Sequence, residues 1–281
     1  MAALPCAVTG HTGTGNVTGL MKISIVTPSF NQGMFIEQTI QSVRDQNHGA
    51  VEHIVVDGGS TDGTVEVLRR YPHLRWLSEK DKGQSDALNK GFRMATGDIV
   101  AWLNSDDWYE PNVLGDIDRY FSAHPECMIL YGDITFVDKQ GNRLYSIAGG
   151  TVSYDRLVAC PDSVRQPSTF WRRSLLDESG GVDPGLHIVM DFDFFLRIGR
   201  GRRFHYLPRN LSYYRCYDEN KSLSLGRLQV KEIYRVYRKN SIRLTPRILR
   251  WLGTKYLLTY GPVKRLHRAI REGRGQEMVI P

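Results

Sequence analysis

Two adjacent carboxylates, Asp106 and Asp107, closely follow the apolar run of residues 98–103. Like charges at the end of a buried strand repel each other and lose hydration, so they need a compensating group. Carboxylate oxygens suit Mg²⁺ or Mn²⁺, which commonly take one or two carboxylates and leave positions for substrate phosphates. A cation held there would neutralise charge on a departing diphosphate. The alternative, that one of the two caps a helix after Pro111, does not account for both.

A third carboxylate, Asp57, follows the apolar run of residues 51–56 and precedes two glycines. A carboxylate in this position can accept hydrogen bonds from a base or a ribose, and the glycines allow a ligand to approach the backbone. The same segment, DGGSTDG, is also typical of a turn followed by a helix cap. The residues alone leave both interpretations open.

Two further carboxylates, Asp191 and Asp193, begin the amphipathic helical pattern of residues 189–200. A carboxylate at a helix start can act as a general base if it faces a ligand site, and partial burial would raise its pKa. Alternatively, both are first-turn acids that complement the helix dipole. Position alone favours this alternative.

The elements that must position these residues alternate along the first half of the chain. Short apolar runs, rich in β-branched residues, are followed by helical patterns, which predicts a parallel sheet covered on both faces. In such sheets ligands bind at the carboxyl ends of the strands. Four segments should therefore share one rim, namely PSFNQG (28–33), DGGSTDG (57–63), EKDKGQSD (79–86) and NSDD (104–107).

The second half of the chain is expected to add antiparallel strands and further helices. Residues 128–138 and 141–150 alternate and turn like antiparallel strands, and residues 166–181 indicate a strand followed by a helix. Residues 203–208 and 211–215 resemble two closing strands. From about Leu225 the pattern is helical and basic, with breaks expected at Pro246, Gly253 and Pro262.

Charge and composition divide the chain into three predicted parts. Residues 226–281 carry 14 Lys and Arg against three Glu, in a chain whose formal charge is +7. We expect a disordered leader over residues 1–20, whose GHTGTG lacks the lysine of a phosphate loop, a catalytic-sized domain over 21–225, and a helical basic extension over 226–281.

The predicted location is cytoplasmic. The four cysteines are widely spaced, as in reducing compartments, and no apolar run approaches the roughly 20 residues of a membrane span. The extension is best interpreted as helices packed on the domain with a solvated basic face. An alternative is peripheral contact with an anionic surface at the inner membrane face. No nucleic-acid partner is expected.

The strand-end segments DGGSTDGT, DKGQSDALNKG and WLNSDD, followed by QPSTFWRR and MDFDFFLR, resemble glycosyltransferase family 2 over roughly residues 22–215. The resemblance implies an α/β GT-A fold, a Rossmann-like and mostly parallel sheet with helices on both faces. It also implies transfer of a sugar from a nucleotide-sugar donor of UDP, GDP or dTDP type to a saccharide or lipid-linked acceptor. The implied cofactor is Mg²⁺ or Mn²⁺, and the implied role lies in cell-envelope polysaccharide synthesis.

On this resemblance, the donor would lie along the ends of the first three strands. Thr27, Pro28 and Phe30 would contact the nucleotide, and Asp57 would accept a hydrogen bond from the nucleotide's base. The segment from Lys82 through Asp86 and Asn89 would line the donor side.

The resemblance places the reaction itself at two carboxylates. Asp106 would hold the metal with support from Asp107, beside donor contacts from Asn104 and Ser105. Asp191 falls at the catalytic base, and Gln166 lies near the acceptor. Direct displacement needs a base for the acceptor hydroxyl and a metal for the leaving diphosphate, and it would invert the anomeric centre.

Three positions depart from the family pattern. Asn104 stands in place of an aspartate, Met190 in place of a glutamate, and Cys216 or Tyr217 in place of a histidine. These departures keep open a second hypothesis, a nucleotide-sugar-binding module without catalysis. A sugar nucleotidyltransferase is less favoured, because PSFNQG has no arginine of the kind its phosphate loop would carry.

Overall fold

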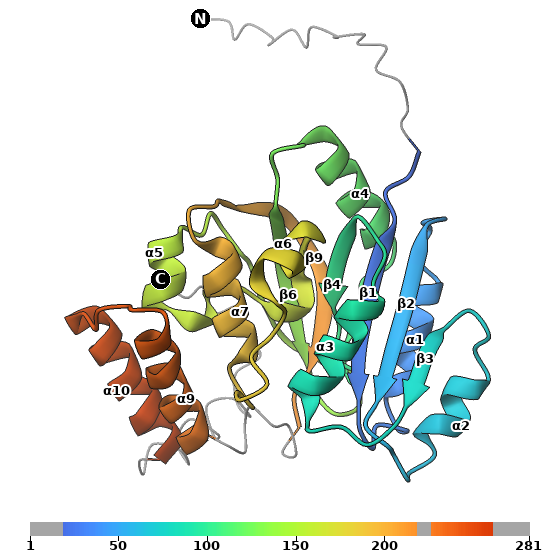
Figure 1. The fold of residues 1–281 in the computed structure, drawn as a ribbon, viewed down its shortest axis with the longest axis horizontal. Helices are drawn as coiled ribbons and strands as arrows, with labels where there is room; N and C mark the ends of the chain where they lie inside the picture. The colour runs from blue at the N-terminus through green and yellow to red at the C-terminus, as the bar shows by residue number, and fades with distance from the viewer. Residues whose placement is uncertain (1–18, 218–225, 261–281) are drawn as a thin grey trace, which may run out of the picture.

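The structure is a computed structural model that describes residues 19–217 and 226–260 (Figure 1). Most of the predicted leader, residues 1–18, therefore lies outside the described residues. The described part is built on one nine-stranded sheet with the order β3-β2-β1-β4-β8-β6-β9-β5, in which β7 also pairs with β6.

The first four strands form the parallel half of the sheet. Every residue of β1 is buried, as expected for an apolar strand covered on both faces. In the register, Ser29 pairs with Asp57 and Asp57 with Ser78, so the carboxyl ends of neighbouring strands meet at one edge. The predicted parallel arrangement is confirmed for β1 (Ile23–Ser29), β2 (Val51–Asp57), β3 (Arg75–Ser78) and β4 (Ile99–Trp102).

The remaining strands make the sheet mixed. The strand β8 runs antiparallel to β4 and to β6, and β9 runs parallel to β6. The two closing strands expected near residues 203–215 are one strand, β9, because Pro208 and Arg209 bulge between Leu207 and Asn210 in the pairing with β6. The elements are β5 (Trp108–Tyr109), β6 (Ile129–Val137), β7 (Arg143–Ile147), β8 (Thr169–Arg172) and β9 (Phe204–Arg215).

Helices cover both faces of the sheet. Along β1, Val26 joins the core beneath α3 and α7, while Ile25 joins the core beneath α1 and α4. Gly91 lets α3 approach β1 closely, because a Cβ there would overlap Cγ1 of Val26. The helices of this region are α1 (Ile36–Arg44), α2 (Thr64–Arg69), α3 (Gln84–Met94), α4 (Val113–Ala123), α5 (Tyr154–Ala159), α6 (Ser174–Ser179) and α7 (Met190–Gly199), with short 3₁₀ turns η1 (Pro161–Ser163) and η2 (Gln166–Ser168).

Two helices, α9 (Gly226–Lys239) and α10 (Pro246–Tyr260), make up the described part of the basic extension. Their apolar residues Ile233, Val236 and Ile248 belong to the same hydrophobic core as α3 and α7. Figure 1 shows the pair beside α5 and α7. The domain boundary at residue 225 stays a prediction, because residues 218–225 are not described.

The breaks predicted in the extension differ in outcome. Pro246 is the first residue of α10, where its missing N–H costs nothing. Gly253, expected to interrupt the helix, lies inside α10, and Pro262 falls outside the described residues. Within the described chain, no helix combines the length and apolar character needed to cross a bilayer.

Candidate functional site

A cavity of about 980 Å³ lies at the carboxyl ends of the parallel strands and extends to η2, α7 and α9. All four segments predicted to share one rim contribute to its wall. The structure thus brings residues from both halves of the sequence to one place. The predicted site residues that line the cavity are Pro28, Phe30, Asn104, Ser105, Asp106, Gln166 and Asp191.

Two residues predicted to contact the nucleotide-sugar donor, Thr27 and Asp57, lie directly behind this wall. The side chain of Thr27 is buried and lies 3.0 Å from Nε2 of His53. Asp57 is completely buried and accepts from the backbone N–H groups of Gly59 and Ser60 at 3.1 and 2.9 Å. Asp57 therefore shapes the glycine loop, and the loop itself lines the cavity.

The other residues predicted to line the sugar-donor side, Lys82, Asp86 and Asn89, make contacts that hold α3 in place. Asp86 accepts from the backbone N–H of Lys82 at 3.2 Å and lies 3.4 Å from the ammonium of Lys90. Asn89 both donates to and accepts from the backbone of Val182, which ties α3 to the segment before α7. Lys82, Asp86 and Asn89 do not line the cavity, whereas their neighbours Lys80, Asp81 and Gln84 do.

The two carboxylates after β4 point to different partners. Asp106 lines the cavity and accepts from the hydroxyl of Tyr217 at 2.8 Å. Asp107 is buried beneath it and accepts from the backbone N–H of Arg215 at 3.0 Å. The N-cap residue of α4, Asn112, makes no side-chain cap bond, and the N–H of Leu114 in the first turn donates to Gln46 at 3.2 Å. The helix-cap alternative for Asp106 and Asp107 is therefore wrong. Burial raises the pKa of Asp106, and burial together with the charge of Asp106 raises the pKa of Asp107.

A buried guanidinium, Arg215 at the end of β9, lies next to this acid pair. It lies between the rings of Phe35 and Trp108, 4.6 and 4.7 Å from their centroids. Its Nε donates to the carbonyl of Asp106 at 3.1 Å, and its other nitrogens donate to the carbonyl of Lys139 and to Gln38. Arg215 thus supplies positive charge within the protein, a role that the sequence analysis did not assign to it.

Asn104 stands where the family has an aspartate, and both ends of its side-chain amide make hydrogen bonds within the protein. Its Oδ1 accepts from the indole N–H of Trp102 at 2.7 Å and from Gln84 at 2.9 Å. Because an indole nitrogen only donates, the oxygen must face it, and Nδ2 is left to donate to Asp107 and Gln166, both at 3.3 Å. Asn104 therefore connects the acid pair to the cavity wall, and its amide oxygen is already engaged by two donors.

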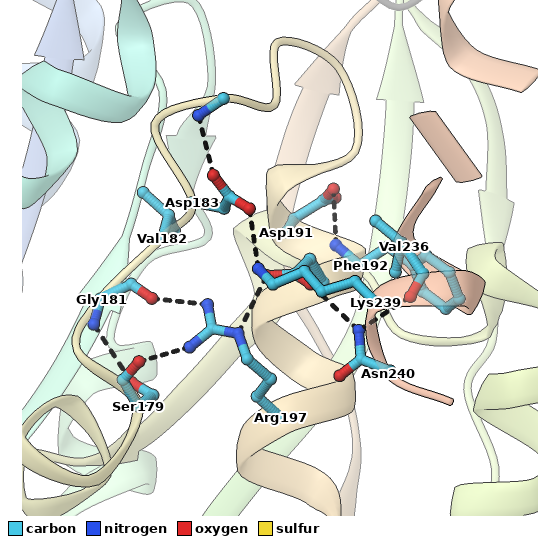
Figure 2. A network of polar contacts seen from close by, with 12 residues as sticks. Ser179, Gly181, Val182, Asp183, Asp191, Phe192, Arg197, Val236, Lys239 and Asn240 are labelled. Carbon is cyan, nitrogen blue, oxygen red and sulfur yellow. Dashed lines mark hydrogen bonds and ion pairs between the residues drawn. The ribbon is translucent and has the colours of Figure 1, made fainter. Parts of the chain in front are cut away.

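The two acids of α7 have different surroundings. Asp191 lines the cavity and accepts from the backbone N–H of Phe192 at 2.8 Å. Burial, with a smaller contribution from the charge of Asp162, raises the pKa of Asp191 to about 6. Asp193 is completely buried and pairs with Arg197 at 2.9 Å and Lys239 at 3.2 Å (Figure 2). Only Asp191 is placed to act on a ligand.

Asp106 presents a carboxylate at the cavity wall, where it could hold a divalent cation if a ligand supplied the remaining oxygens. No group of three or more His, Cys, Asp or Glu side chains with metal-binding geometry occurs among the described residues. Mg²⁺ and Mn²⁺ do not require one when a diphosphate supplies the remaining oxygens. Tyr217, near the position where the family has a histidine, contacts Asp106 directly.

These contacts predict that Arg215→Met destabilises the protein by about 2–4 kcal/mol, because several charge-assisted hydrogen bonds are lost beside two buried carboxylates. Urea unfolding followed by circular dichroism measures the change. The control Arg69→Met, at an exposed position on α2, should change the free energy of unfolding by less than about 0.5 kcal/mol. Equal effects of the two substitutions would contradict the role given to Arg215.

The chain is similar to known proteins over much of its length. Residues 24–180 match the family described as Glycosyl transferase family 2. An uncharacterized glycosyltransferase of Mycobacterium tuberculosis is 32% identical over 186 residues, 64% of this chain and 70% of the relative. A PGL/p-HBAD biosynthesis glycosyltransferase of Mycobacterium bovis is 30% identical over 180 residues, 62% of this chain and 68% of the relative.

Solved structures show the same fold. TarS residues 1–349 of S. aureus, in complex with UDP-GlcNAc, gives a TM-score of 0.63 at 19% identity and covers 84% of this chain and 73% of that chain. The mannosyltransferase PcManGT from Pyrobaculum calidifontis, in complex with GDP-Man and Mn²⁺, gives 0.59 at 19% identity and covers 90% and 74%. The chain spans 44% of a longer TarS structure. The predicted GT-A fold is confirmed.

Proposed function

Since the chain belongs to glycosyltransferase family 2, we propose that it transfers a sugar from a nucleotide diphosphate sugar to a hydroxyl acceptor by a metal-assisted single displacement. The observation that carries this proposal is that Asp106 and Asp191 line one cavity, together with all four strand-end segments. The UDP-GlcNAc and GDP-Man of the structurally similar proteins support a donor of this class.

The nucleotide is proposed to bind over the ends of β1 and β2. Pro28, the exposed ring of Phe30 and the glycine loop shaped by Asp57 form this part of the wall. Thr27 and Asp57 act from behind the wall, and Lys82 and Asp86 act by fixing the start of α3. Lys80 adds a cation on the same side, where it can face a diphosphate.

Asp106 is proposed to hold Mg²⁺ or Mn²⁺, which would neutralise charge on the departing diphosphate. Asp107 does not line the cavity. Its contribution is to fix the loop that follows β4, because it accepts hydrogen bonds from Arg215 and Asn104. Ser105 and Asn104 complete the wall beside Asp106.

Asp191 is proposed to take the proton of the acceptor hydroxyl. A carboxylate whose pKa is about 6 is mostly ionised at neutral pH and is still a stronger base than an exposed aspartate. With one base and no covalent intermediate, the reaction inverts the anomeric centre, so an α-linked donor gives a β-glycoside. Gln166 lies on the same wall and is proposed to contact the acceptor.

The acceptor is proposed to be a saccharide or a lipid-linked intermediate in cell-envelope polysaccharide synthesis. Apolar side chains, including Val164, Ile188 and Met190, form the wall near Asp191 and suit an acceptor with an apolar part. The basic extension would allow cytoplasmic protein to contact an anionic membrane surface peripherally. Flotation of the full chain with anionic and neutral vesicles distinguishes this contact from a purely structural extension.

A binding module without catalysis is the second candidate. The observation that favours it is the amide of Asn104, which is consumed by internal hydrogen bonds where the family has an acid. Binding of a nucleotide sugar without transfer or slow donor hydrolysis would favour this candidate over the enzyme.

Nucleotide binding is expected to depend on the metal through Asp106. Calorimetric titration of UDP and GDP, each with and without Mn²⁺, should show binding that Mn²⁺ strengthens at least about tenfold, and Asp106→Asn should remove this gain. Asp155→Asn, at an exposed position on α5, serves as the control and should bind as the wild type does. Nucleotide binding that changes neither with Mn²⁺ nor with Asp106→Asn would exclude the metal from the proposed mechanism.

Two acids on one helix give a matched test of the base. Asp191→Asn should keep donor binding and stability but lower kcat for sugar transfer by about 10²–10⁴-fold, because the proton acceptor is lost. Asp193→Asn should instead lower the melting temperature, because Arg197 and Lys239 lose their buried partner. Release of the nucleoside diphosphate and thermal unfolding measure the two effects. Wild-type turnover in Asp191→Asn would refute the assignment.

The pH profile should report the same carboxylate. Because the base acts when ionised, kcat should fall as pH decreases through about 6, approaching tenfold per pH unit. Asp162→Asn should move this limb to lower pH, since the charge of Asp162 helps to raise the pKa of Asp191. Rates measured at constant ionic strength from roughly 1.5 pH units below this value to about two above it test this. Absence of this fall in kcat at low pH, or its persistence in Asp191→Asn, would contradict the assignment of the titration to Asp191.

A further inference from the structure

The helix α9 contacts the segment that leads directly into Asp191. Glu232, a buried residue of α9, accepts from the backbone N–H groups of His187 and Ile188, both at 2.8 Å, and of Val189 at 3.3 Å. Three consecutive N–H groups thus converge on one carboxylate that lies more than 40 residues away in the sequence.

These N–H groups belong to the three residues that lead into α7, the last of which, Val189, is its N-cap residue. The residue before the helix, Val189, has no side chain that could cap it. Glu232 therefore supplies, from another element, a charged acceptor for the segment that fixes where α7 begins. Removing it would leave buried donors unsatisfied two residues from Asp191.

Further contacts of α9 hold the same stretch of chain. Arg235 donates to the carbonyl of Gly185 at 3.1 Å, and Lys239 bridges Asp183 and Asp193 at 2.7 and 3.2 Å. Figure 2 shows Lys239 and Asn240 reaching toward α7. Asn240 donates to Asp193 of this helix at 3.2 Å. In addition, Gln229 and Ile233 of α9 form part of the cavity wall.

We infer that Glu232 is a positioning residue for Asp191, and that α9 is part of the catalytic site and not a separate basic appendage. The inference rests on the proposed function, in which Asp191 is the base. The Asp191 carboxyl is oriented by the first turn of α7, through the N–H of Phe192. A displacement of that turn by about 1 Å would lower turnover by up to about a hundredfold without touching the nucleotide.

The test compares Glu232→Ala and Glu232→Gln with Lys231→Ala, a neighbouring exposed position on α9. Steady-state transfer or donor hydrolysis is measured with whichever of UDP-GlcNAc and GDP-mannose the wild type turns over faster. Glu232→Ala should lower kcat by about tenfold to a hundredfold and leave the donor KM within about twofold. Glu232→Gln keeps one acceptor oxygen and should recover much of the loss, while Lys231→Ala should match the wild type.

Backbone amide exchange, followed by mass spectrometry, gives a readout that does not need turnover. In Glu232→Ala and Glu232→Gln, exchange should accelerate over residues 187–193, more strongly in the alanine variant, and stay unchanged over β1 to β4. If the wild type turns over neither donor, the proposed function is refuted for these two donors, and the exchange result still decides the structural role of Glu232. Unchanged protection of residues 187–193, or a loss confined to donor KM, would overturn the inference. If the alanine variant does not fold, the glutamine variant decides.

Discussion

Burial of two adjacent carboxylates at the end of β4 constrains the elements around the cavity. Asp106 and Asp107 lose hydration and repel each other, so the fold must bring compensating groups to them. β9 brings the guanidinium of Arg215, held between two aromatic rings. The loop itself is held by α1, because the hydroxyl of Thr39 donates to the backbone carbonyl of Asp107 at 2.7 Å. The result is a loop held by β9 and α1, with Asp106 left at the cavity wall. A cation bound there would complete the compensation.

Asp191 has the opposite requirement. As the proposed base it must be held in position with a raised pKa, and its charge must not be neutralised by a cation. Burial at the start of α7 provides the pKa, and the contacts of α9 hold the turn that carries the carboxyl. Both acids at the cavity are therefore held by residues from the last third of the described chain, Asp106 by Arg215 and Tyr217 and the turn that carries Asp191 by Glu232. The sheet brings the strand ends together, and these later residues determine how the acids point.

Much of this arrangement could be predicted from local patterns. Apolar strands alternating with helices predict the parallel half of the sheet, and the carboxyl-end rule places the four segments that line the cavity. Residue-level geometry could not be predicted in the same way. Thr27, Asp57 and Asp86 lie in or directly before the expected segments, but their side chains bond behind the wall. The role of Arg215 depends on a contact across 108 residues, and no local pattern encodes such a contact.

The measurement that tests the central claim most directly is the anomeric configuration of the first product. In the absence of an acceptor, water takes its place, and ¹H NMR at short times resolves the anomer released from UDP-GlcNAc or GDP-mannose before it mutarotates. A single displacement assisted by one base predicts that the β-anomer appears first from the α-linked donor. Initial release of the α-anomer would contradict the account, because it requires either two displacements or attack on the retained face.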